Sequence, residues 1–568
     1  MPERNASIAA VLDEIADLLD IQGANPFRVR AYRNAARSIS DLGTEVDALI
    51  EQGTPITDIA GIGEDLAKRI VEIQHTGTCD VLKQLHAELS PAITQLLKIP
   101  ALGPRRVKTL YYDLHIQNLE QLLDAANAGL IRGLPGFGEK TERRIAQTVQ
   151  SRLAMARRHP LVTAASYAEP LADYLRTLSG VSRVEIAGSY RRMRATVGDI
   201  DMVAIAAPDS AIMERFVAYP EVNQILSKGP TRSSVLIDPG LQIDLRSMTE
   251  ESFGAAMVYF TGSKAHNIAI RRMGQERGLK INEYGVFREA VRIAGDTEES
   301  VYETIDLPWI PPELREGRGE IEAAQSERLP ELIKDLLGDL HLRLTPGESP
   351  TAVLQAAYAQ GLKYIAMVIE VPEFAREDVA WARREISALR NLSADEAGPA
   401  VLIGVEAGID PTGQLDIADS VLRLFDLVIV SVRGALDLAV EAQTQRVLTA
   451  LEHRSVAVFA QPRTTEDARF DLDFAAVARK AAQRGIALEI SLHPDRIAPP
   501  EHFLESAKRA GARFVITSEA NNPDELRALR FSLGFARRGG LEPAQVLNRN
   551  PLSALTAWLE GRHKESGR

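Results

Sequence analysis

Two aspartates, Asp199 and Asp201, have the residue type and spacing expected of a catalytic metal site. Apolar runs flank their motif, which predicts a strand, and side chains at positions i and i+2 of a strand point to the same face. Upstream, Gly188 and Ser189 open a turn whose backbone N–H groups suit a phosphate. Because bare carboxylates would repel that phosphate, the arrangement predicts divalent cations. Two metal ions bridged by carboxylates, roughly 3.5–4 Å apart, are a common device for in-line phosphoryl transfer.

A third carboxylate, Asp244, lies where such a site needs one. Residues 240–246 alternate apolar and polar types as a half-buried strand does, which places Asp244 on a neighbouring strand. Asp-x-Asp is frequent in proteins, and by itself it indicates no catalytic role. The Gly-Ser pair at its fixed offset, the arginines between and the strand context favour catalysis. Three acids on two strands therefore predict nucleotidyl transfer with two Mg²⁺ or Mn²⁺ ions.

Short amphipathic helices are predicted for the N-terminal part of the chain, up to about residue 155. Three apolar turns of similar sequence, at 59–64, 99–104 and 134–139, each precede a helical stretch that contains Lys or Arg. The middle turn has Ala101 in place of its first glycine. Such turns leave backbone N–H groups free at a helix N-terminus, where they bind a DNA phosphate without reading sequence. The residues expected to contact DNA are Gly61, Gly63, Gly103, Arg105, Gly136, Gly138 and Lys140.

Strands and helices alternate in the rest of the chain. Residues 316–327 are charged and poor in apolar types, which predicts a linker. After about residue 335, apolar strands at 364–369, 427–432, 456–460 and 514–517 alternate with helices. This order indicates an α/β domain with a barrel-like parallel sheet.

Composition limits the class of protein. With 568 residues, 45% of them hydrophobic, the chain is long enough for several globular domains. The single cysteine, Cys79, excludes a disulfide framework and indicates a reducing compartment. There is no signal-peptide pattern and no apolar run of membrane-spanning length, so we expect a cytoplasmic, nucleoid-associated protein without a membrane partner. The net charge of −12 argues only weakly against DNA binding, because basic residues cluster at 28–37, 105–108 and 191–194.

These motifs, together with Tyr-Phe-Thr-Gly-Ser at 259–263 and Trp-Ile-Pro-Pro-Glu-Leu-Arg at 309–315, resemble a family X DNA polymerase. The resemblance is to the bacterial and archaeal type, which is fused to a C-terminal PHP (polymerase and histidinol phosphatase) domain, and it covers essentially the whole chain. It implies a multidomain α+β and α/β fold. The implied parts are a lyase-like, 5′-phosphate-binding helix-hairpin-helix domain (1–85), a helical DNA-binding helix-hairpin-helix domain (86–157), a nucleotidyltransferase palm with a mixed sheet (158–250), a nucleotide-selection domain (251–325) and a PHP-like (β/α) barrel (335–568).

The resemblance also implies roles for single residues. Asp199 and Asp201 would bind both metals, and Asp244 would bind the catalytic metal and help to activate the primer 3′-hydroxyl. Met193 and Ala195 replace a glycine and an acid that are common in the family. The implied nucleotide-binding residues are Gly188 with Ser189, Arg192 and Gly198 at the triphosphate, Tyr259 and Phe260 at the sugar, Gly262, and Asn267 with Arg271 at the base edge and template strand.

In the N-terminal domain, the resemblance places Arg28 and Tyr32 at a bound 5′-phosphate. The lyase nucleophile of the family is a lysine after the first glycine turn, and Arg69 occupies that position here. Arginine stays protonated and cannot form a Schiff base. Lys68 is one residue early, about 100° around a helix, and is expected to point elsewhere. The sequence therefore argues against lyase activity.

The PHP-like domain departs most from the family pattern, in which His, Asp and Glu hold a metal cluster. Arginine and isoleucine cannot ligate a metal ion, and most of the imidazole ligands are replaced. His341, Glu406 and Glu519 could at most hold one weakly bound metal, so we expect a folded domain without the cluster. His493 is expected to be a surface or loop histidine. The positions that match the degenerate site are His341, Arg343, Ile369, Glu370, Glu406, Arg433, Gln461, Glu519 and Asn521.

Three functions are compatible with these features. The first is a monomeric, template-directed polymerase that fills short gaps in DNA repair, with gapped or primer-template DNA and dNTPs as partners. The second adds a residual 3′–5′ exonuclease in the PHP-like domain, and the third is a non-catalytic DNA-end-binding protein. In the first, the C-terminal domain would act as a scaffold that docks on the polymerase or positions DNA.

Overall fold

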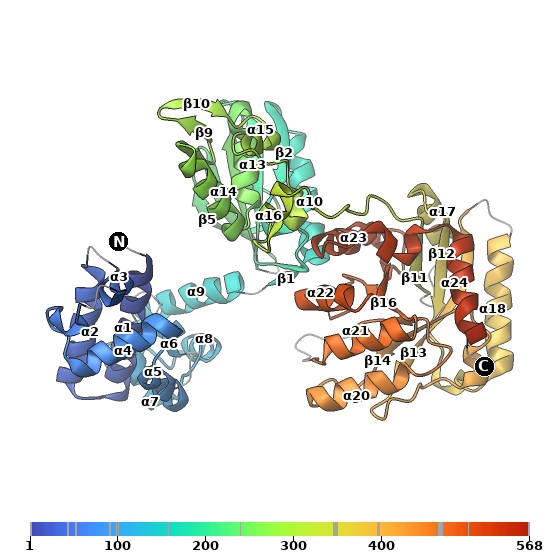
Figure 1. Cartoon of the computed structure of the whole chain (residues 1–568), viewed down its shortest axis with the longest axis horizontal. Coiled ribbons are helices and arrows are strands. Elements are labelled where there is room, and N and C mark those ends of the chain that lie inside the picture. Colours follow the sequence, from blue (N-terminus) through green and yellow to red (C-terminus); the bar gives the residue numbers. More distant parts are fainter. Residues whose placement is uncertain are drawn as a thin grey trace. The chain divides into compact units, whose positions relative to one another are not determined.

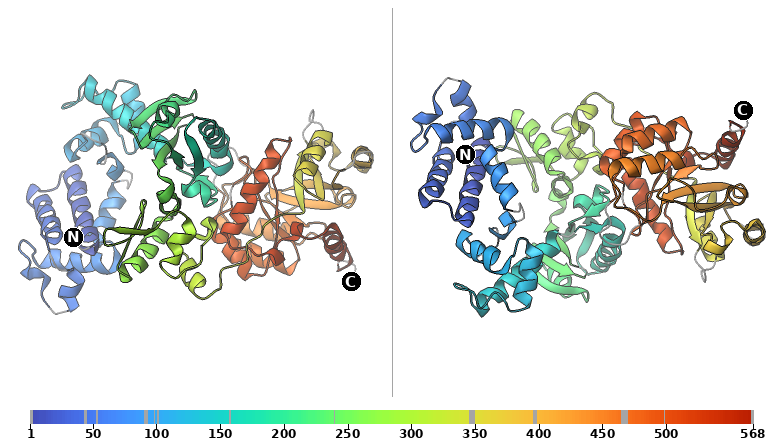
Figure 2. Two further views of the ribbon diagram at one scale, coloured as in Figure 1. Left: turned by 90° about the horizontal axis from the view of Figure 1, so that it is seen from above. Right: turned by 90° about the horizontal axis from the view of Figure 1, so that it is seen from below.

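The computed structural model describes residues 3–42, 45–51, 54–89, 93–97, 99, 102–156, 158–238, 240–344, 350–394, 398–463, 470–497 and 499–565. Ala101, in the middle glycine turn, lies outside the described residues. The chain divides into two compact units, Met1–Arg157 and Arg158–Arg568 (Figures 1 and 2). In the described part, no helix is both long and apolar enough to cross a bilayer.

The first unit consists of helices within the described residues, as the sequence predicts (blue to cyan in Figure 2). The core forms around α1 (Glu3–Gln22), where Leu12, Ile15 and Leu19 recur at helical spacing and are buried. The free thiol of Cys79 is buried in the same core. The other helices are α2 (Pro26–Ser40), α3 (Val46–Glu51), α4 (Glu64–Thr76), α5 (Asp80–Glu88), α6 (Ile93–Leu97), α7 (Pro104–Leu114), α8 (Leu119–Asn127) and α9 (Glu139–Ala156), with the 3-10 turn η1 (Ile56–Asp58).

The second unit begins with a five-stranded mixed sheet in the order β2-β4-β7-β6-β5. β4 and β7 are parallel, and the other neighbours are antiparallel. Ile200 and Met202 face the core on one side of β4, while Val203 packs with Phe253 on the other side. The elements are β1 (His159–Pro160), α10 (Leu161–Arg176), β2 (Val181–Ile186), α11 (Gly188–Arg191), β3 (Thr196–Val197), β4 (Asp199–Ala206), α12 (Ile212–Val217), β5 (Val222–Lys228), β6 (Arg232–Ile237) and β7 (Leu241–Met248).

A small helical layer with a three-stranded antiparallel sheet follows, and its core includes Ile270, Val286 and Tyr302. The predicted linker at 316–327 is wrong, because this segment is folded: Glu320 is buried and accepts hydrogen bonds from His266 and from the backbone of Gly317. The elements are η2 (Glu250–Ser252), α13 (Phe253–Thr261), α14 (Lys264–Glu276), β8 (Leu279–Asn282), β9 (Gly285–Arg288), β10 (Val291–Ala294), α15 (Glu298–Glu303), η3 (Pro312–Leu314) and α16 (Glu320–Gln325).

The C-terminal region contains a seven-stranded, all-parallel sheet in the order β11 to β17, which confirms the predicted α/β architecture (Figure 1). The Arg343 N–H at the end of β11 donates to the Ala520 carbonyl, so the first strand meets the segment after the last strand. The strands are β11 (Gly338–Leu344), β12 (Tyr364–Ile369), β13 (Ala400–Ile409), β14 (Leu427–Val432), β15 (Val458–Phe459), β16 (Ala487–Ile490) and β17 (Arg513–Ile516).

Helices and short 3-10 turns connect these strands. The helices are α17 (Pro350–Ala359), α18 (Val379–Ala394), α19 (Asp419–Leu422), α20 (Val440–Ala450), α21 (Phe474–Gln483), α22 (Glu501–Arg509), α23 (Leu529–Arg538) and α24 (Leu552–Glu565), and the 3-10 turns are η4 (Glu373–Ala375), η5 (Glu525–Ala528), η6 (Pro543–Gln545) and η7 (Leu547–Arg549).

One hydrophobic core joins the mixed sheet and the parallel sheet. From the part around the mixed sheet it contains Tyr190 of α11 and Ile243 of β7. From the part around the parallel sheet it contains Phe531 and Phe535 of α23. Figure 1 shows α23 beside α10, at the junction between these two parts. The C-terminal domain is therefore packed directly on the part of the chain that carries the acidic motif.

Candidate active site

Strand register brings the three predicted carboxylates together. β4 and β7 run parallel with Asp201 directly opposite Asp244, and Asp199 precedes Asp201 by two positions on the same face. Gly188 lies against this group, because a Cβ on Gly188 would be 2.7 Å from a carboxylate oxygen of Asp201. The positive φ of Gly188, 62°, also favours glycine at this turn. The sheet and the glycine turn thus converge on one acidic site.

The acidic site has a charge imbalance that a cation would relieve. Burial, together with the neighbouring Asp199 and Asp244 carboxylates, raises the pKa of Asp201 to about 7. Burial and Asp244 raise the pKa of Asp199 in the same way. Asp244 is oriented by hydrogen bonds from the Ser234 hydroxyl and, at 3.2 Å, from the Gln242 side-chain amide. An all-oxygen donor set with raised pKa values fits hard divalent cations such as Mg²⁺ or Mn²⁺.

The predicted nucleotide-binding residues line a single cavity of about 630 Å³ beside the carboxylates. Besides Asp199 and Asp201, its wall contains Gly188, Ser189, Arg192, Gly198, Tyr259, Phe260, Gly262, Asn267 and Arg271. Four further basic residues line it without having been predicted there: Arg158, Arg194, Arg246 and Lys264. The cavity thus places cationic side chains opposite the carboxylates, as binding of a polyphosphate next to metal ions requires.

Aromatic rings and arginines form one wall of the cavity. The rings of Tyr259 and Phe260 meet edge to face, with centroids 5.0 Å apart. The Arg271 guanidinium lies 4.7 Å from the centroid of the Tyr259 ring, and that of Arg246 lies 4.3 Å from the Phe260 ring. The Asn267 side-chain amide donates to the Tyr259 carbonyl at 2.7 Å. Arg246 follows Asp244 by two positions, so its place on the same face could have been inferred from the strand alternation.

Two arginines of the 191–194 cluster make structural contacts. Arg191 binds Glu298 with both of its terminal nitrogens, at 2.8 and 2.7 Å, so its guanidinium is engaged in an ion pair within the fold. Arg192 is buried, donates to the Thr261 carbonyl, and pairs with Glu316 at 2.8 Å. Arg192 nevertheless lines the cavity, packed 3.2 Å from where a Cβ on Gly262 would lie.

In the first unit, the glycine turns sit at helix N-termini. Gly63 and Gly103 are the N-caps of α4 and α7, and Gly138 directly precedes α9. A Cβ on any of these three glycines would meet nothing within 4 Å, so packing does not require glycine there. Gly61 and Gly136 both have φ of 83°, which favours glycine. Arg105 and Lys140 are exposed at the starts of α7 and α9.

The predicted 5′-phosphate residues also come together. Tyr32 is buried on α2, and Arg28 hydrogen-bonds its hydroxyl. Burial raises the pKa of Tyr32, and the positive charges of Arg69 and Arg28 partly offset this effect. Arg69 therefore faces Tyr32, whereas Lys68 next to it is exposed. This agrees with the helical argument that the two side chains point in different directions.

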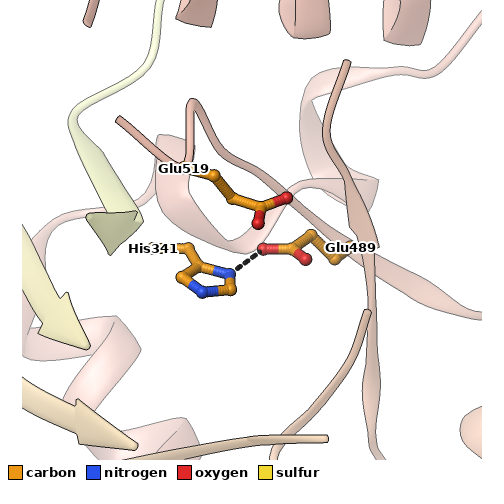
Figure 3. Close-up of side chains that lie close together, drawn as sticks. All are labelled: His341, Glu489 and Glu519. Carbon is orange, nitrogen blue, oxygen red and sulfur yellow. Dashed lines mark hydrogen bonds and ion pairs between the residues drawn. The ribbon is translucent and has the colours of Figure 1, made fainter. Parts of the chain in front are cut away.

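In the C-terminal domain, arginines occupy the acidic cluster at the ends of the parallel strands. His341, Glu489 and Glu519 converge, and the His341 Nδ1 atom lies 2.7 Å from Glu489 (Figure 3). The fully buried Arg496 pairs with Glu519 at 2.6 Å and with Glu406 at 3.0 Å, and Arg463 also binds Glu406. Sequence reasoning missed Glu489, Arg463 and Arg496, because no motif marks them and they meet only in the folded sheet.

Charges balance within this cluster. Burial would lower the pKa of His341, but Glu489, Glu519 and Glu406 outweigh burial and raise it. Burial would raise the pKa of Glu406, but Arg496, His341 and Arg463 lower it. Glu406, Glu489 and Glu519 thus face two guanidinium groups and one imidazolium. A fourth acid, Asp339, accepts hydrogen bonds from the Ser518 hydroxyl and the His341 backbone N–H, and burial raises its pKa to about 6.

The other positions of the degenerate site have structural contacts. Arg343 donates to His493 at 2.9 Å. His493 lies in an irregular loop, as one of the two predicted alternatives has it, but its side chain is buried and not at the surface. Such a burial could not be read from a loop sequence. The remaining positions are Ile369, buried in the core; Glu370, exposed and 3.9 Å from Arg463; Arg433, 3.4 Å from Asp416; Gln461, whose carbonyl accepts from Arg496; and Asn521, whose N–H donates to Glu525.

Several known protein families and relatives match parts of this chain. Family models match at 3–79 (helix-hairpin-helix domain), 93–151 (SAM-like helix-hairpin-helix tandem) and 256–316 (DNA polymerase beta thumb). DNA polymerase lambda of Arabidopsis thaliana is 22% identical over 352 residues, which cover 55% of this chain and 62% of the relative. A protein named "Probable phosphatase" from Syntrophotalea carbinolica is 29% identical over 162 residues, 27% of this chain and 66% of the relative.

A full-length relative shows the family. The "DNA polymerase/3'-5' exonuclease PolX" of Bacillus subtilis is 30% identical over 572 residues, which cover 97% of this chain and 99% of the relative. The matched length spans the helix-hairpin-helix regions, the mixed sheet and the parallel C-terminal sheet. The chain therefore belongs to the PolX group of family X DNA polymerases and is a DNA-directed DNA polymerase.

Proposed function

We propose that this polymerase fills short gaps in DNA by two-metal nucleotidyl transfer at Asp199, Asp201 and Asp244. The observation that carries the proposal is the register of β4 and β7, which sets Asp244 directly beside Asp201, a residue of the cavity wall. Mg²⁺ or Mn²⁺ bound there supplies charge neutralisation for the attack of a primer 3′-hydroxyl on the α-phosphate of a dNTP, with pyrophosphate leaving. As an enzyme of chromosomal DNA, it is expected to act at the nucleoid.

The residues around the carboxylates divide the remaining tasks. Asp199 and Asp201 would hold both ions, and Asp244 would hold one of them. Ser189, Arg192 and Gly198 grip the triphosphate, for which the planar guanidinium of Arg192 is suited. Gly188 and Gly262 leave room for it in the cavity wall. Tyr259 and Phe260 pack on the sugar, and Asn267 with Arg271 faces the base pair.

DNA binding is assigned to the first unit. The glycine turns at Gly61, Gly63, Gly103, Gly136 and Gly138 present helix N-termini to a phosphate, supported by their open surface and by exposed Arg105 and Lys140. Arg28 and Tyr32, with Arg69 beside them, would hold the 5′-phosphate of a gap. We propose one role for each of the five segments. Residues 1–85 bind the 5′-phosphate, 86–157 bind DNA, 158–250 carry out catalysis and 251–325 select the nucleotide. Residues 335–568 act as a scaffold.

A one-nucleotide gap with a 5′-phosphate tests the catalytic proposal. The wild-type enzyme is expected to insert one nucleotide, whereas Asp244→Ala is expected to bind the same DNA and insert none. Full-rate insertion by Asp244→Ala would remove Asp244 from the mechanism. DNA binding without insertion by the wild type would favour the non-catalytic DNA-end binder instead.

The balanced charges around Arg496 favour a C-terminal domain without a metal cluster over a second nuclease. Its three carboxylates already have guanidinium and imidazolium partners, so a metal ion would have to displace a buried cation. The Asp199→Ala, Asp201→Ala double variant is therefore expected to leave a labelled 3′ end intact in Mn²⁺. Metal-dependent loss of 3′ nucleotides by that variant would establish the exonuclease alternative.

A further inference from the structure

Helix α23 of the C-terminal domain contacts the turn that follows the glycine motif. The Phe531 ring meets Tyr190 edge to face at 6.0 Å, and Arg530 pairs with Glu169. A Cβ on Gly534 would lie 2.4 Å from the Met193 side chain, so only glycine leaves room for Met193. Met193 itself has a φ of 55°. The helix is thus fitted closely to the residues on either side of Arg192.

A buried carboxylate connects this helix to the cavity. Glu316 pairs with Arg192 at 2.8 Å and with Arg538 at 3.3 Å. Arg192, Arg538 and Glu316 are all at least nine-tenths buried as side chains. Arg192 belongs to the cavity wall, Glu316 to the segment after η3, and Arg538 to the last turn of α23. One carboxylate therefore joins the nucleotide cavity to the C-terminal domain.

A buried charge is costly when it loses its partner. A triphosphate that binds Arg192 competes with Glu316 for this guanidinium, whose Nε atom donates to the Glu316 carboxylate at 2.8 Å. Because Arg538 remains on Glu316, the carboxylate is not left unpaired, and the release of Arg192 becomes less costly. Among the described side chains, removal of Arg538 would leave Arg192 as the cation that pairs with Glu316. Glu316 would then bind Arg192 more strongly and compete with the nucleotide for it.

We propose that Arg538 of the C-terminal domain is a positioning residue for the incoming nucleotide, acting through Glu316 on Arg192. The inference rests on the proposed role of Arg192 at the triphosphate. It gives the C-terminal domain a part in polymerisation that needs no metal of its own. By reciprocity, nucleotide binding would tighten the contact between Arg538 and Glu316.

The test compares Arg538→Met with Arg537→Met in steady-state filling of a one-nucleotide gap. Arg537 is the matched control, because it lies on the same helix and pairs with Glu313 at 2.8 Å, outside the cavity. Arg538→Met is expected to raise KM for dNTP roughly tenfold, a usual size for coupling between sites. The kcat value and the affinity for DNA should stay within about twofold of wild type, and Arg537→Met should change none of them.

Two further variants keep the proposal falsifiable if Arg538→Met folds poorly. Glu316→Gln removes the charge that holds Arg192, so it should lower KM for dNTP. In this Glu316→Gln background, adding Arg538→Met should not raise KM. Arg538→Lys should restore much of the wild-type KM. An unchanged KM in Arg538→Met, an equal rise in Arg537→Met, or a raised KM in Glu316→Gln would overturn the proposal. Failure of every variant and of wild type to fill the gap would instead refute the proposed function.

Discussion

Arg496 is expected to hold the C-terminal domain together in place of a metal ion. Replacing it by Met keeps most of the volume but removes the cation that Glu519 pairs with at 2.6 Å. Glu406 keeps Arg463, so the loss falls mainly on the fully buried Glu519. Removing one partner of a buried ion pair costs about 3–5 kcal/mol. At roughly 2–4 °C per kcal/mol for a domain of this size, Arg496→Met should lower Tm by about 10 °C.

Calorimetry of the full chain with and without Mn²⁺ measures this effect. The wild-type transition of the C-terminal domain should be the same in EDTA and in Mn²⁺, because Glu406, Glu489 and Glu519 already have cationic partners. Arg496→Met should regain part of the lost Tm in Mn²⁺, since His341, Glu489 and Glu519 converge closely enough to ligate an ion. Arg463→Met is the control: Arg463 is partly exposed, so the shift should be smaller. A Tm loss under about 1 °C in Arg496→Met, or Mn²⁺ stabilisation of the wild type, would refute this reasoning.

Three further predictions concern other parts of the chain. Burial would raise the pKa of Glu298, but Arg191 and Arg315 outweigh burial and lower it to about 2. The ionised Glu298 therefore contributes roughly 3 kcal/mol to the free energy of unfolding above pH 4.5, and this contribution is lost as the pH falls toward 2. Glu298→Gln should therefore reduce stability to urea at pH 7 and flatten its acid dependence over that interval; parallel curves for variant and wild type would contradict this. Gly63→Val with Gly138→Val should weaken DNA binding roughly tenfold in a filter-binding assay. The loss of Tm should be small, because a Cβ meets nothing at either position, although Val is a poorer N-cap than Gly. Equal affinity would exclude these turns from the DNA contact. With Arg69 at the lysine position, borohydride should trap no adduct with a 5′-deoxyribose phosphate end, and a trapped adduct would show another nucleophile.

The sequence predicted local features of the site well. The alternation at 240–246 placed Asp244 on a strand, and the two-residue spacing put Asp199 and Asp201 on one face. Pairing of β4 with β7 joins residues far apart in the chain, so their register came only from the structure. The basic residues at Arg28 and Lys140 lie at the helices predicted to carry them.

Other features depended on burial, which the sequence pattern did not reveal. The composition of residues 316–327 predicts a linker, but Glu316 and Glu320 are each buried against a specific partner. The arginine that neutralises the C-terminal cluster is equally hidden, since Arg496 meets Glu406 and Glu519 across the sheet. Charged residues in a segment without apolar periodicity normally face solvent, so a buried ion pair contradicts the usual pattern. The roles proposed for the C-terminal domain rest on these contacts.

The central claim is that three carboxylates hold two metal ions around the reacting phosphate. The most direct measurement is anomalous diffraction from crystals of the enzyme grown with Mn²⁺, gapped DNA and a non-hydrolysable dNTP analogue. Two Mn²⁺ peaks should appear, both contacting Asp199 and Asp201 and one also contacting Asp244, with the triphosphate beside Arg192. Ordered nucleotide without manganese at these carboxylates, or manganese bound elsewhere in the cavity, would contradict the account.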